Sequence, residues 1–485
     1  MTGPDGSRPP VIDRRNPTRP AEIVGCVAAA TTADVTEAVD AAARAQRHWA
    51  ATPLAERTAA VVAASDAVIA RRDELAELLA RELGKPLADS AGEIGFARGL
   101  VGHCAATAPA ALADEVVDVG DGRLELTTLP YGVVGAITPW NAPVTLAAMK
   151  FAPALLAGNA VVTKPSPLAP LTVTAVLEEL AAHLPAGLVG VVNGGVDVGR
   201  ALVADPRIAK VAFTGGGEAA RHLQRDLADR LVPSVLELGG NDAAIVCADA
   251  VLDDAAVERL VHGAFLTAGQ VCMAAKRIYV DRSRYDELVE RYVAVAARAL
   301  VLGDPLDPTV TVGPLVSEAQ CARVATLVGD ARRRGATVVE LGTVPDPELV
   351  AGGWFLRPTL VLGLDDDAPL VATEQFGPTV PIIAVDGDDD AVARANASEL
   401  GLAASVWSGD EEHAFALARR IEAGTVFIGT HNRSGMTFRS PFGGVKQSGW
   451  GRELGDDAVR AYVQQRAIHR PAALGSGRDY PGQAA

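Results

Sequence analysis

The sequence has little that would hold a disulfide-built or metal-built domain together. Its cysteines number five, an odd count, and no two of them have the C-x-x-C spacing or stand with histidine at zinc-ligand spacing. They are Cys26, Cys104, Cys247, Cys272 and Cys321. We therefore expect neither a disulfide framework nor a structural metal site, and this cysteine usage fits a reducing compartment such as the cytoplasm.

An excess of positive charge is also missing. The formal net charge is −16, which argues against a nucleic-acid partner. Residues 1–17, "MTGPDGSRPPVIDRRNP", lack the apolar core of a secretory signal. The uncharged stretch 126–149 is long enough to cross a bilayer, but three prolines and Asn141 would break a spanning helix, so we expect no membrane segment.

What the sequence does contain is the pattern of a large α/β protein. Its 485 residues exceed one domain, and 49% of them are hydrophobic, enough for several cores. From residue 131 to 250, apolar runs such as "NAVVTKPS" and "KVAFTGGG" alternate with helical stretches, and a second alternation starts near residue 251. This alternation predicts two doubly wound parallel-sheet domains, which divide near residues 236–242.

Other segments predict helices and an arm. Residues 1–30 look extended, and helical patterns cover residues 31–50, 53–84 and 87–113. Two alternating runs around a Gly-Asp-Gly turn predict a β-hairpin over residues 115–130, and residues 460–469 are a strand candidate of similar character. Hairpin and strand could serve subunit assembly, although the hairpin could equally be a local surface feature.

Several apolar runs end in polar, glycine-rich segments, at residues 138–143, 163–167, 193–199 and 213–217. Ligands collect at the carboxyl ends of parallel strands, and glycines before a helix let a phosphate approach its N-terminus. Neither G-x-G-x-x-G nor a P-loop pattern is present. Taken alone, these segments fit tight turns as well as they fit a nucleotide site.

Three residues are candidates for chemistry. Cys272, in "AFLTAGQVCMAAKR", has small neighbours that would admit a substrate, although a cysteine in such a segment is more often buried and inert. Glu237, between leucines in "LELGG", would have the raised pKa of a buried general base, or would cap a backbone turn. Glu374, in "ATEQFGP", precedes a rigid corner and could be an ordinary loop acid.

Seven motifs occur in one order along the chain: PWN, KPS, FTGG, LELGG, GQVC, EQFGP and PFGGVKQSGWGRELG. Together they resemble the NAD(P)-dependent aldehyde dehydrogenase superfamily, in its non-acylating branch, over nearly the whole chain. The resemblance implies a cofactor-binding domain, a catalytic domain, and an oligomerisation arm with a C-terminal tail. These parts correspond to residues 1–114 with 131–239, residues 240–445, and residues 115–130 with 446–485.

The resemblance implies NAD(P)-dependent oxidation of an aldehyde to a carboxylic acid. Cys272 would attack the aldehyde, Asn141 and the Cys272 N–H would hold the oxyanion, and Glu237 would activate the water that hydrolyses the thioester. Glu453, in "GRELG", matches a family acid that relays protons, or is a surface helix acid. The alternatives are a CoA-acylating semialdehyde dehydrogenase, which generally lacks the base, and a catalytically silent protein on the same fold.

The cofactor implied is NAD. The residues that match its site are Ile137, Pro139, Trp140, Lys164, Ser166, Gly195, Gly199, Gly216, Glu374 and Phe376. Lys164 would reach the adenosine ribose, Gly216 would start a helix over the pyrophosphate, and Glu374 would hold the nicotinamide ribose. Pro167 stands where many NAD-specific members have a glutamate that repels a 2′-phosphate, so the sequence leaves NADP open.

The substrate side departs from the family pattern. Ala142 and Met149 stand where many members have aromatic tunnel residues, which predicts a wider, aliphatic tunnel. The matched entrance loop carries Arg433 and Arg439, which either hold an anionic group or face solvent or a neighbouring subunit. The partners expected are a small aldehyde and further copies of the chain in a homodimer or homotetramer, with no nucleic acid, membrane or metal.

Overall fold

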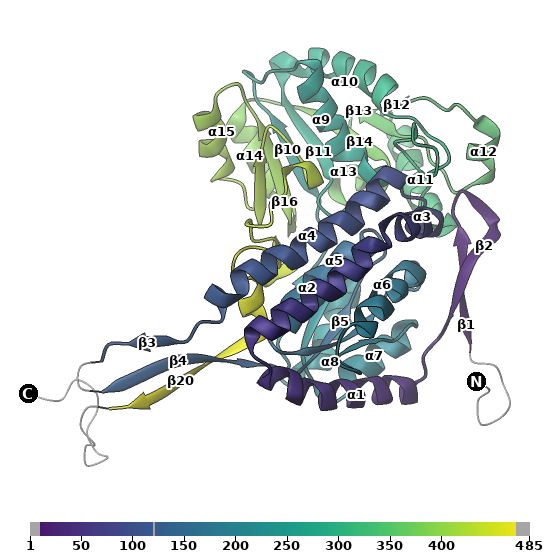
Figure 1. Cartoon of the computed structure of the whole chain (residues 1–485). Helices are drawn as coiled ribbons and strands as arrows, with labels where there is room; N and C mark the ends of the chain where they lie inside the picture. Colours follow the sequence, from purple (N-terminus) through teal and green to yellow (C-terminus); the bar gives the residue numbers. More distant parts are fainter. Residues whose placement is uncertain (1–9, 120–121, 472–485) are drawn as a thin grey trace, which may run out of the picture.

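The structure, a computed structural model, describes residues 10–119 and 122–471. Two α/β units lie one above the other in Figure 1, and a β arm extends from the lower one. Three parts of the predicted segments lie outside the described residues: 1–9 of the extended start, the hairpin turn at 120–121, and 472–485 of the tail. Within the part that the structure describes, no helix is long and apolar enough to cross a membrane.

The lower unit is built on a six-stranded sheet in the order β19-β9-β8-β5-β6-β7. All its strands pair in parallel except the short edge strand β19. The strands are β5 (Val133–Ile137), β6 (Ala160–Lys164), β7 (Val189–Val191), β8 (Ile208–Thr214), β9 (Ser234–Glu237) and β19 (Gly449–Trp450).

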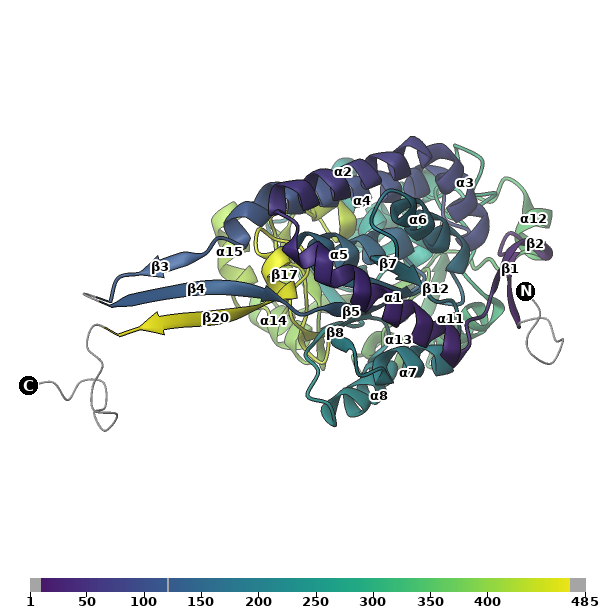
Figure 2. The ribbon, with the colours of Figure 1, turned by 60° about the horizontal axis from the view of Figure 1, so that its bottom comes forward.

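Helices cover both faces of this sheet. The helices α1, α7 and α8 pack on one face, and α5 and α6 on the other, with α2, α3 and α4 outside them (Figure 2). They are α1 (Thr32–Ala51), α2 (Leu54–Ala70), α3 (Arg72–Leu83), α4 (Leu87–Ala111), α5 (Pro143–Leu156), α6 (Pro170–Ala182), α7 (Val196–Ala204) and α8 (Gly217–Ala228). The predicted helix 53–84 is therefore two helices, because the backbone of Arg71 leaves helical geometry between α2 and α3.

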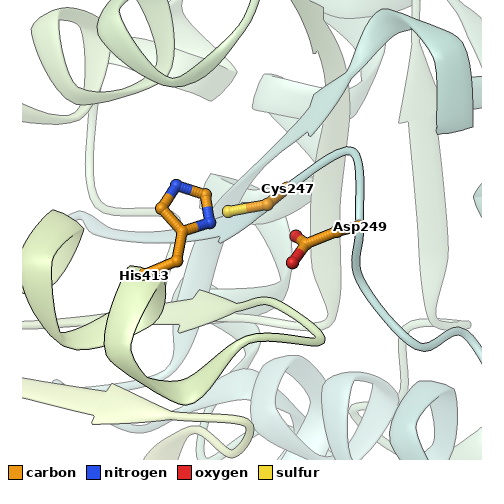
Figure 3. Close-up of side chains that lie close together, drawn as sticks. All are labelled: Cys247, Asp249 and His413. Carbon is orange, nitrogen blue, oxygen red and sulfur yellow. The ribbon is translucent and has the colours of Figure 1, made fainter.

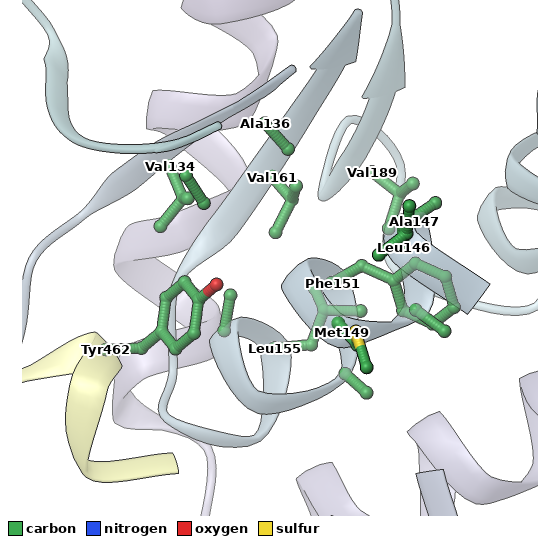
Figure 4. Close-up of a cluster of buried hydrophobic side chains, with 14 of the residues drawn as sticks. Val134, Ala136, Leu146, Ala147, Met149, Phe151, Leu155, Val161, Val189 and Tyr462 are labelled. Carbon is green, nitrogen blue, oxygen red and sulfur yellow. The ribbon is translucent and has the colours of Figure 1, made fainter. Parts of the chain in front are cut away.

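The core of the lower unit is centred on α5. Every residue of this helix except Thr145 is buried, which fits its almost wholly apolar sequence. Figure 4 shows side chains of α5, among them Phe151 and Leu155, next to those of β5, β6 and β7 in one hydrophobic cluster. Lys150 is the one charged residue of α5, and it is fully buried in this core.

The upper unit is built on a seven-stranded sheet in the order β12-β13-β14-β11-β10-β16-β17, parallel except for β12. The strands are β10 (Asp242–Val246), β11 (Ala275–Asp281), β12 (Thr337–Glu340), β13 (Thr359–Leu362), β14 (Thr379–Val385), β16 (Ala403–Trp407) and β17 (Thr425–Ile428). Its helices are α9 (Asp254–Phe265), α10 (Tyr285–Ala299), α11 (Glu318–Arg333), α12 (Pro347–Gly352), α13 (Pro369–Ala372), α14 (Asp388–Asn396) and α15 (Glu411–Ala418). The predicted class, α/β with parallel-sheet domains, is confirmed.

The chain crosses from the lower to the upper sheet between Glu237, the last residue of β9, and Asp242, the first of β10. The domain boundaries given above stay a prediction, but residues 446–485 are not all arm and tail. Strand β19 returns to pair with β9, and β18 (Val445–Lys446) pairs with β15 (Leu400–Gly401). Short pairings between distant segments of this kind leave no local sequence pattern.

The arm has three strands rather than the two of the predicted hairpin. Strand β4 (Arg123–Pro130) pairs antiparallel with β3 (Glu115–Val117) and, along its whole length, with β20 (Val463–Arg470). Figure 2 shows this sheet extending away from both units. At the start of the chain, β1 (Val11–Asn16) and β2 (Arg19–Ala28) form an antiparallel pair, which corresponds to the predicted extended start.

Candidate active site

Cys272 lies in the segment that leads from α9 to β11, at the amino edge of the seven-stranded sheet. Thr267 and Ala268 in this segment have φ angles of 53° and 54°, which non-glycine residues rarely adopt. Gln270 holds the segment in place: its side-chain oxygen accepts a hydrogen bond from the Val316 N–H at 3.0 Å, and its amide donates to the Thr267 carbonyl at 3.2 Å. Side-chain contacts therefore fix the strained backbone that presents the cysteine.

The half-buried thiol of Cys272 is surrounded by charged groups. Burial raises its pKa to about 12; the Lys276 ammonium opposes this, and the carboxylates of Glu374, Asp242 and Glu237 add to it. Lys276 directs its hydrogen bonds to backbone, including the carbonyl of Cys272 itself. The residue therefore rests as a thiol, and a nearby base has to take its proton before it can attack a carbonyl.

Cys272 and Asn141 line one cavity of about 70 Å³. Apolar side chains make up most of its wall: Phe96, Leu146, Met149, Leu266, Val271, Met273, Met436 and Phe442. Ala142 and Met149 lie in the wall as predicted, but Phe96, Met436 and Phe442 stand in the same space. The cavity is apolar, as expected, but it is not the wider tunnel that the two substitutions predicted.

The charged residues around this cavity are paired. Arg433 donates to Asp89 at 2.6 Å, and Lys85 is bound to Glu93 with both side chains buried. The Arg439 guanidinium is exposed and contacts Asp456 at 3.1 Å. Arg433 is therefore already paired in the wall of this cavity, and Arg439 is not part of that wall.

Glu237, at the end of β9, is 2% exposed, and neither of its carboxylate oxygens has a hydrogen-bond partner. Burial raises its pKa well above the usual value and the charge of Glu453 adds to this, while Lys150 and Arg452 oppose it. Gly443 has a φ of 157°, and a Cβ there would come within 2.7 Å of the Glu237 carboxylate. A buried carboxyl with a raised pKa, beside a cysteine, is suited to proton transfer near neutral pH.

Glu453 is not a surface acid, because it is 3% exposed. Its Oε1 accepts a hydrogen bond from the Lys150 ammonium at 2.8 Å, and Lys150 also donates to the Thr214 hydroxyl at 2.7 Å. Lys150 is not among the predicted site residues, although a lone lysine in the apolar run "LAAMKFAPALL" is a usable sign, since lysine is almost never buried unpaired. Lys150 on α5 is therefore bound to Glu453, and the charge of Glu453 in turn acts on Glu237.

Lys164, the last residue of β6, lines a second cavity of about 550 Å³. Its wall includes the predicted residues Ile137, Gly195 and Gly199, and also Pro167. Burial lowers the Lys164 pKa to about 8, and its ammonium donates to the Pro165 carbonyl at 3.0 Å. Ser166 is not part of this wall; its hydroxyl accepts from the Leu168 N–H at 3.2 Å and stabilises the turn.

A third cavity, of about 470 Å³, lies beside Glu374. The Glu374 carboxylate accepts from the Gly240 N–H at 3.1 Å, and any side chain at Gly239 would collide with it. Arg323 donates to the backbone carbonyls of Glu374 and Gln375 and holds this loop against α11. Because Gly239 and Gly240 have no side chains, the backbone of "LELGG" can lie close to the carboxylate of Glu374 in "ATEQFGP".

Aromatic residues border the same region. Phe376 follows with a φ of 53°, a conformation rare outside glycine, and its ring meets the edge of Trp140 at 5.3 Å between centroids. Pro139 and Trp140 belong to the loop that leaves the carboxyl end of β5. The structure thus brings two motifs, PWN and EQFGP, together across the two units.

The second and third cavities share Glu218, in the first turn of α8. Gly216 is the N-cap of this helix, and no atom lies within 4 Å of the position that a Cβ would take there. Helix N-termini bind phosphate groups through their free N–H groups. The open start of α8 lies between two cavities and is therefore suited to a phosphate group.

The sequence and the fold both match known proteins. The profile described as "Aldehyde dehydrogenase family" matches residues 5–468. A geranial dehydrogenase from Castellaniella defragrans is 39% identical over 92% of this chain and 93% of its own length. A betaine aldehyde dehydrogenase from Rhizobium etli is 36% identical over 92% of this chain and 91% of its own length.

Solved structures agree with these sequence matches. A putative aldehyde dehydrogenase from Burkholderia cenocepacia superposes with a TM-score of 0.92 at 35% identity, covering 99% of this chain and 97% of that chain. A betaine aldehyde dehydrogenase from Staphylococcus aureus, solved in complex with NAD+, superposes with a TM-score of 0.91 at 30% identity, covering 98% of this chain and 94% of that chain.

Proposed function

The chain belongs to the aldehyde dehydrogenase family, and we propose that its substrate is an uncharged aliphatic aldehyde. The reaction is the NAD-dependent oxidation of an aldehyde to a carboxylic acid, so the resemblance drawn from the seven motifs is confirmed. The substrate class and the roles of single residues are our further proposals, and they rest on the geometry of the three cavities.

The main support for an uncharged aliphatic substrate is that the charged side chains around the apolar cavity are paired with one another. A carboxylated aldehyde needs a free arginine, but Arg433 is bound to Asp89. A quaternary ammonium aldehyde needs an unpaired carboxylate or a cage of several aromatic rings. Glu93 is bound to Lys85, and the wall of this cavity has two aromatic rings, Phe96 and Phe442, and no Trp or Tyr. Of the two named relatives, the geranial dehydrogenase therefore supplies the better guide than the betaine aldehyde dehydrogenase.

We assign the first chemical step to Cys272, Asn141 and Glu237. Ionised Glu237 takes the thiol proton, the sulfur bonds to the aldehyde carbon, and the carbonyl oxygen becomes an oxyanion. The side-chain amide of Asn141, in the wall of the same cavity, and the Cys272 N–H stabilise that oxyanion. Bound NAD would supply the hydride acceptor for this oxidation, and the acyl group would remain on the Cys272 sulfur as a thioester.

The second step is hydrolysis. After Glu237 has released the thiol proton to solvent, it takes a proton from water, and the water oxygen bonds to the thioester carbon. The bond to the Cys272 sulfur then breaks, which releases the acid and leaves a thiolate that regains its proton from Glu237. The buried pair of Glu453 and Lys150 sets the charge beside Glu237 and offers the proton a way out. Since Glu237 supplies the base for water, CoA is not needed as an acceptor.

The cofactor would lie across the start of α8. Lys164 would bind the adenosine ribose, the N–H groups after Gly216 the pyrophosphate, and Glu374 the nicotinamide ribose. Trp140 and Phe376 would pack near the nicotinamide. Pro167 in the adenosine-side wall places no negative charge against a 2′-phosphate, which supports weak use of NADP beside NAD.

A substrate panel tests the proposal. Rates of NADH formation without CoA are measured for hexanal, octanal, geranial, benzaldehyde, betaine aldehyde and succinic semialdehyde, with Arg433→Ala and Arg439→Ala in parallel. The uncharged aliphatic aldehydes are expected to give the highest kcat/KM, and Arg439→Ala should leave the order unchanged. A preference for betaine aldehyde, or for the semialdehyde with a loss in either arginine variant, would reject this substrate class.

We also propose a cytoplasmic homo-oligomer, joined through the arm. Four apolar side chains of the arm are exposed in the single chain: Val116, Val119, Leu129 and Ile468. A second copy would cover them, and closed symmetric assemblies are the usual outcome. Light scattering should give the mass of a dimer or tetramer, and Ile468→Glu should reduce it; a monomeric wild type would refute the assembly.

A further inference from the structure

A second cluster of reactive side chains lies at the far edge of the seven-stranded sheet from Cys272. Cys247 and Asp249 follow the carboxyl end of β10, and His413 lies in the first turn of α15. One ligand atom from each of the three residues lies within 4.8 Å of the other two (Figure 3). Since β10 runs parallel to β11 and Cys272 precedes β11, the cluster is about one strand length from the nucleophile.

The histidine of this cluster is held in one orientation. Figure 3 shows a ring nitrogen of His413 facing Cys247 and Asp249. The other nitrogen, Nε2, is 2.7 Å from Oδ2 of Asp388, the first residue of α14. A metal-binding imidazole usually donates its second N–H to a carboxylate in this way, which fixes its tautomer and raises its basicity.

The remaining two groups are also oriented. The Ser408 hydroxyl donates to Oδ2 of Asp249 at 2.7 Å, so the carboxylate is fixed. Cys247 is 1% exposed, and Figure 3 shows its sulfur directed toward the His413 ring. The carboxylates of Asp249 and Asp388 both lie near the same ring, and a divalent cation would balance their negative charge.

We propose that Cys247, Asp249 and His413 bind a zinc ion. Sulfur, nitrogen and oxygen donors together are the set that Zn²⁺ takes, whereas Mg²⁺ and Ca²⁺ prefer oxygen alone. On binding, the Cys247 sulfur replaces its proton with the metal and the proton passes to solvent. Water completes the coordination on the side of Asp249, which is exposed. The ion would tie β10 to α15 and, through Asp388, to α14.

The test uses the full chain with Cys272→Ala, so that the nucleophile cannot bind the metal. Equilibrium dialysis against Zn²⁺ should give one equivalent per chain, and Mg²⁺ in excess should not displace it. Co²⁺ in place of Zn²⁺ should give a thiolate-to-cobalt charge-transfer band. Asp388→Asn, which removes only the carboxylate behind His413, should weaken binding about 10–100-fold.

Matched variants locate the site. Cys247→Ser and His413→Ala should each lose the equivalent of zinc and the cobalt band, while Cys321→Ser and His262→Ala should keep both. His413 is half-exposed, so its variant stays informative if Cys247→Ser does not fold. The proposal is overturned if the parent chain binds no zinc, or if zinc binds equally well after both cluster substitutions.

Discussion

The Lys150 ammonium donates a hydrogen bond to Glu453 at 2.8 Å, and both side chains are withdrawn from water. The same lysine donates to Thr214, the last residue of β8, which is the register partner of the proposed base Glu237 on the neighbouring strand β9. The pair therefore joins a central helix of the cofactor unit to the C-terminal segment. It also sets the local charge that Glu237 experiences, because Glu453 raises the pKa of Glu237 and Lys150 lowers it.

Glu453→Gln should extend activity to lower pH. Glu237 must be ionised to act as a base, so the rate is lost as the pH falls through its raised pKa. Removing the Glu453 charge while Lys150 stays lowers that pKa, and the acidic limb of the kcat profile should move to lower pH. Glu258→Gln, at an exposed position, is the matched control and should not move it. An unmoved or upward-moved limb in Glu453→Gln would show that the two acids are not coupled.

Lys150→Met should destabilise the protein more than a double substitution does. The single change leaves the buried Glu453 without its partner, an effect of about 3–5 kcal/mol for buried ion pairs. In Lys150→Met with Glu453→Leu no uncompensated charge remains, so much of the stability should return. Melting temperatures at one scan rate give the comparison; a double variant no more stable than Lys150→Met would mean that packing, not charge, limits this site.

The sequence predicted the helices and strands of the protein better than the contacts between segments that lie far apart in the chain. Parallel strands and their helices followed from periodicity, and the helix break at Arg71 was missed because it has no glycine or proline. The arm's third strand, β20, pairs with β4 across more than half the chain, and local patterns carry no information on such pairing. The proximity of Cys247 to His413 could not be predicted for the same reason, since zinc-ligand spacing is visible in a sequence only when the ligands lie close along the chain.

For the proposed catalytic centre, motif order predicted Cys272, Asn141 and Glu237, and the structure brings all three to the same region. The sequence did not show that the thiol rests with a raised pKa, because that depends on burial and on carboxylates from other segments. Nor did it show the pairing of Arg433 with Asp89 on α4. Charge compensation is a property of the assembled site, so an arginine in a matched loop is weak evidence for an anionic substrate.

Glu237→Gln should separate the two chemical steps. If Glu237 activates the hydrolytic water, the thioester still forms at high pH but persists, so NADH appears in a burst of about one per active site before a slow steady rate. The steady rate should fall about 10²–10⁴-fold, the usual contribution of a general base. Rapid-mixing absorbance measures both phases. Cys272→Ala should give no burst at all, and a steady rate without a burst in Glu237→Gln would place the loss before acylation.

Pro167→Glu should increase the preference for NAD over NADP. The side chain at this position lines the adenosine-side cavity with Lys164, and a carboxylate there would repel a 2′-phosphate. We expect kcat/KM with NADP to fall at least about tenfold, equivalent to about 1.4 kcal/mol, with little change for NAD. Pro167→Gln removes the ring without adding charge and serves as the control. An equal loss for both cofactors in Pro167→Glu would indicate a distorted turn instead of electrostatic selection.

Phe96→Ala should widen the substrate cavity where the family pattern alone predicted width. The Phe96 ring packs on Phe438 with 4.8 Å between centroids and helps to fill the space beside Met149. Its removal leaves room for a branched or aromatic aldehyde, so kcat/KM for benzaldehyde should rise relative to hexanal. Phe415→Ala, at an exposed position on α15, should leave the ratio unchanged. If Phe96→Ala lowers both rates equally, Phe96 supports the entrance loop and does not select the substrate; a raised ratio would identify this ring, not Ala142 or Met149, as the limit on substrate width.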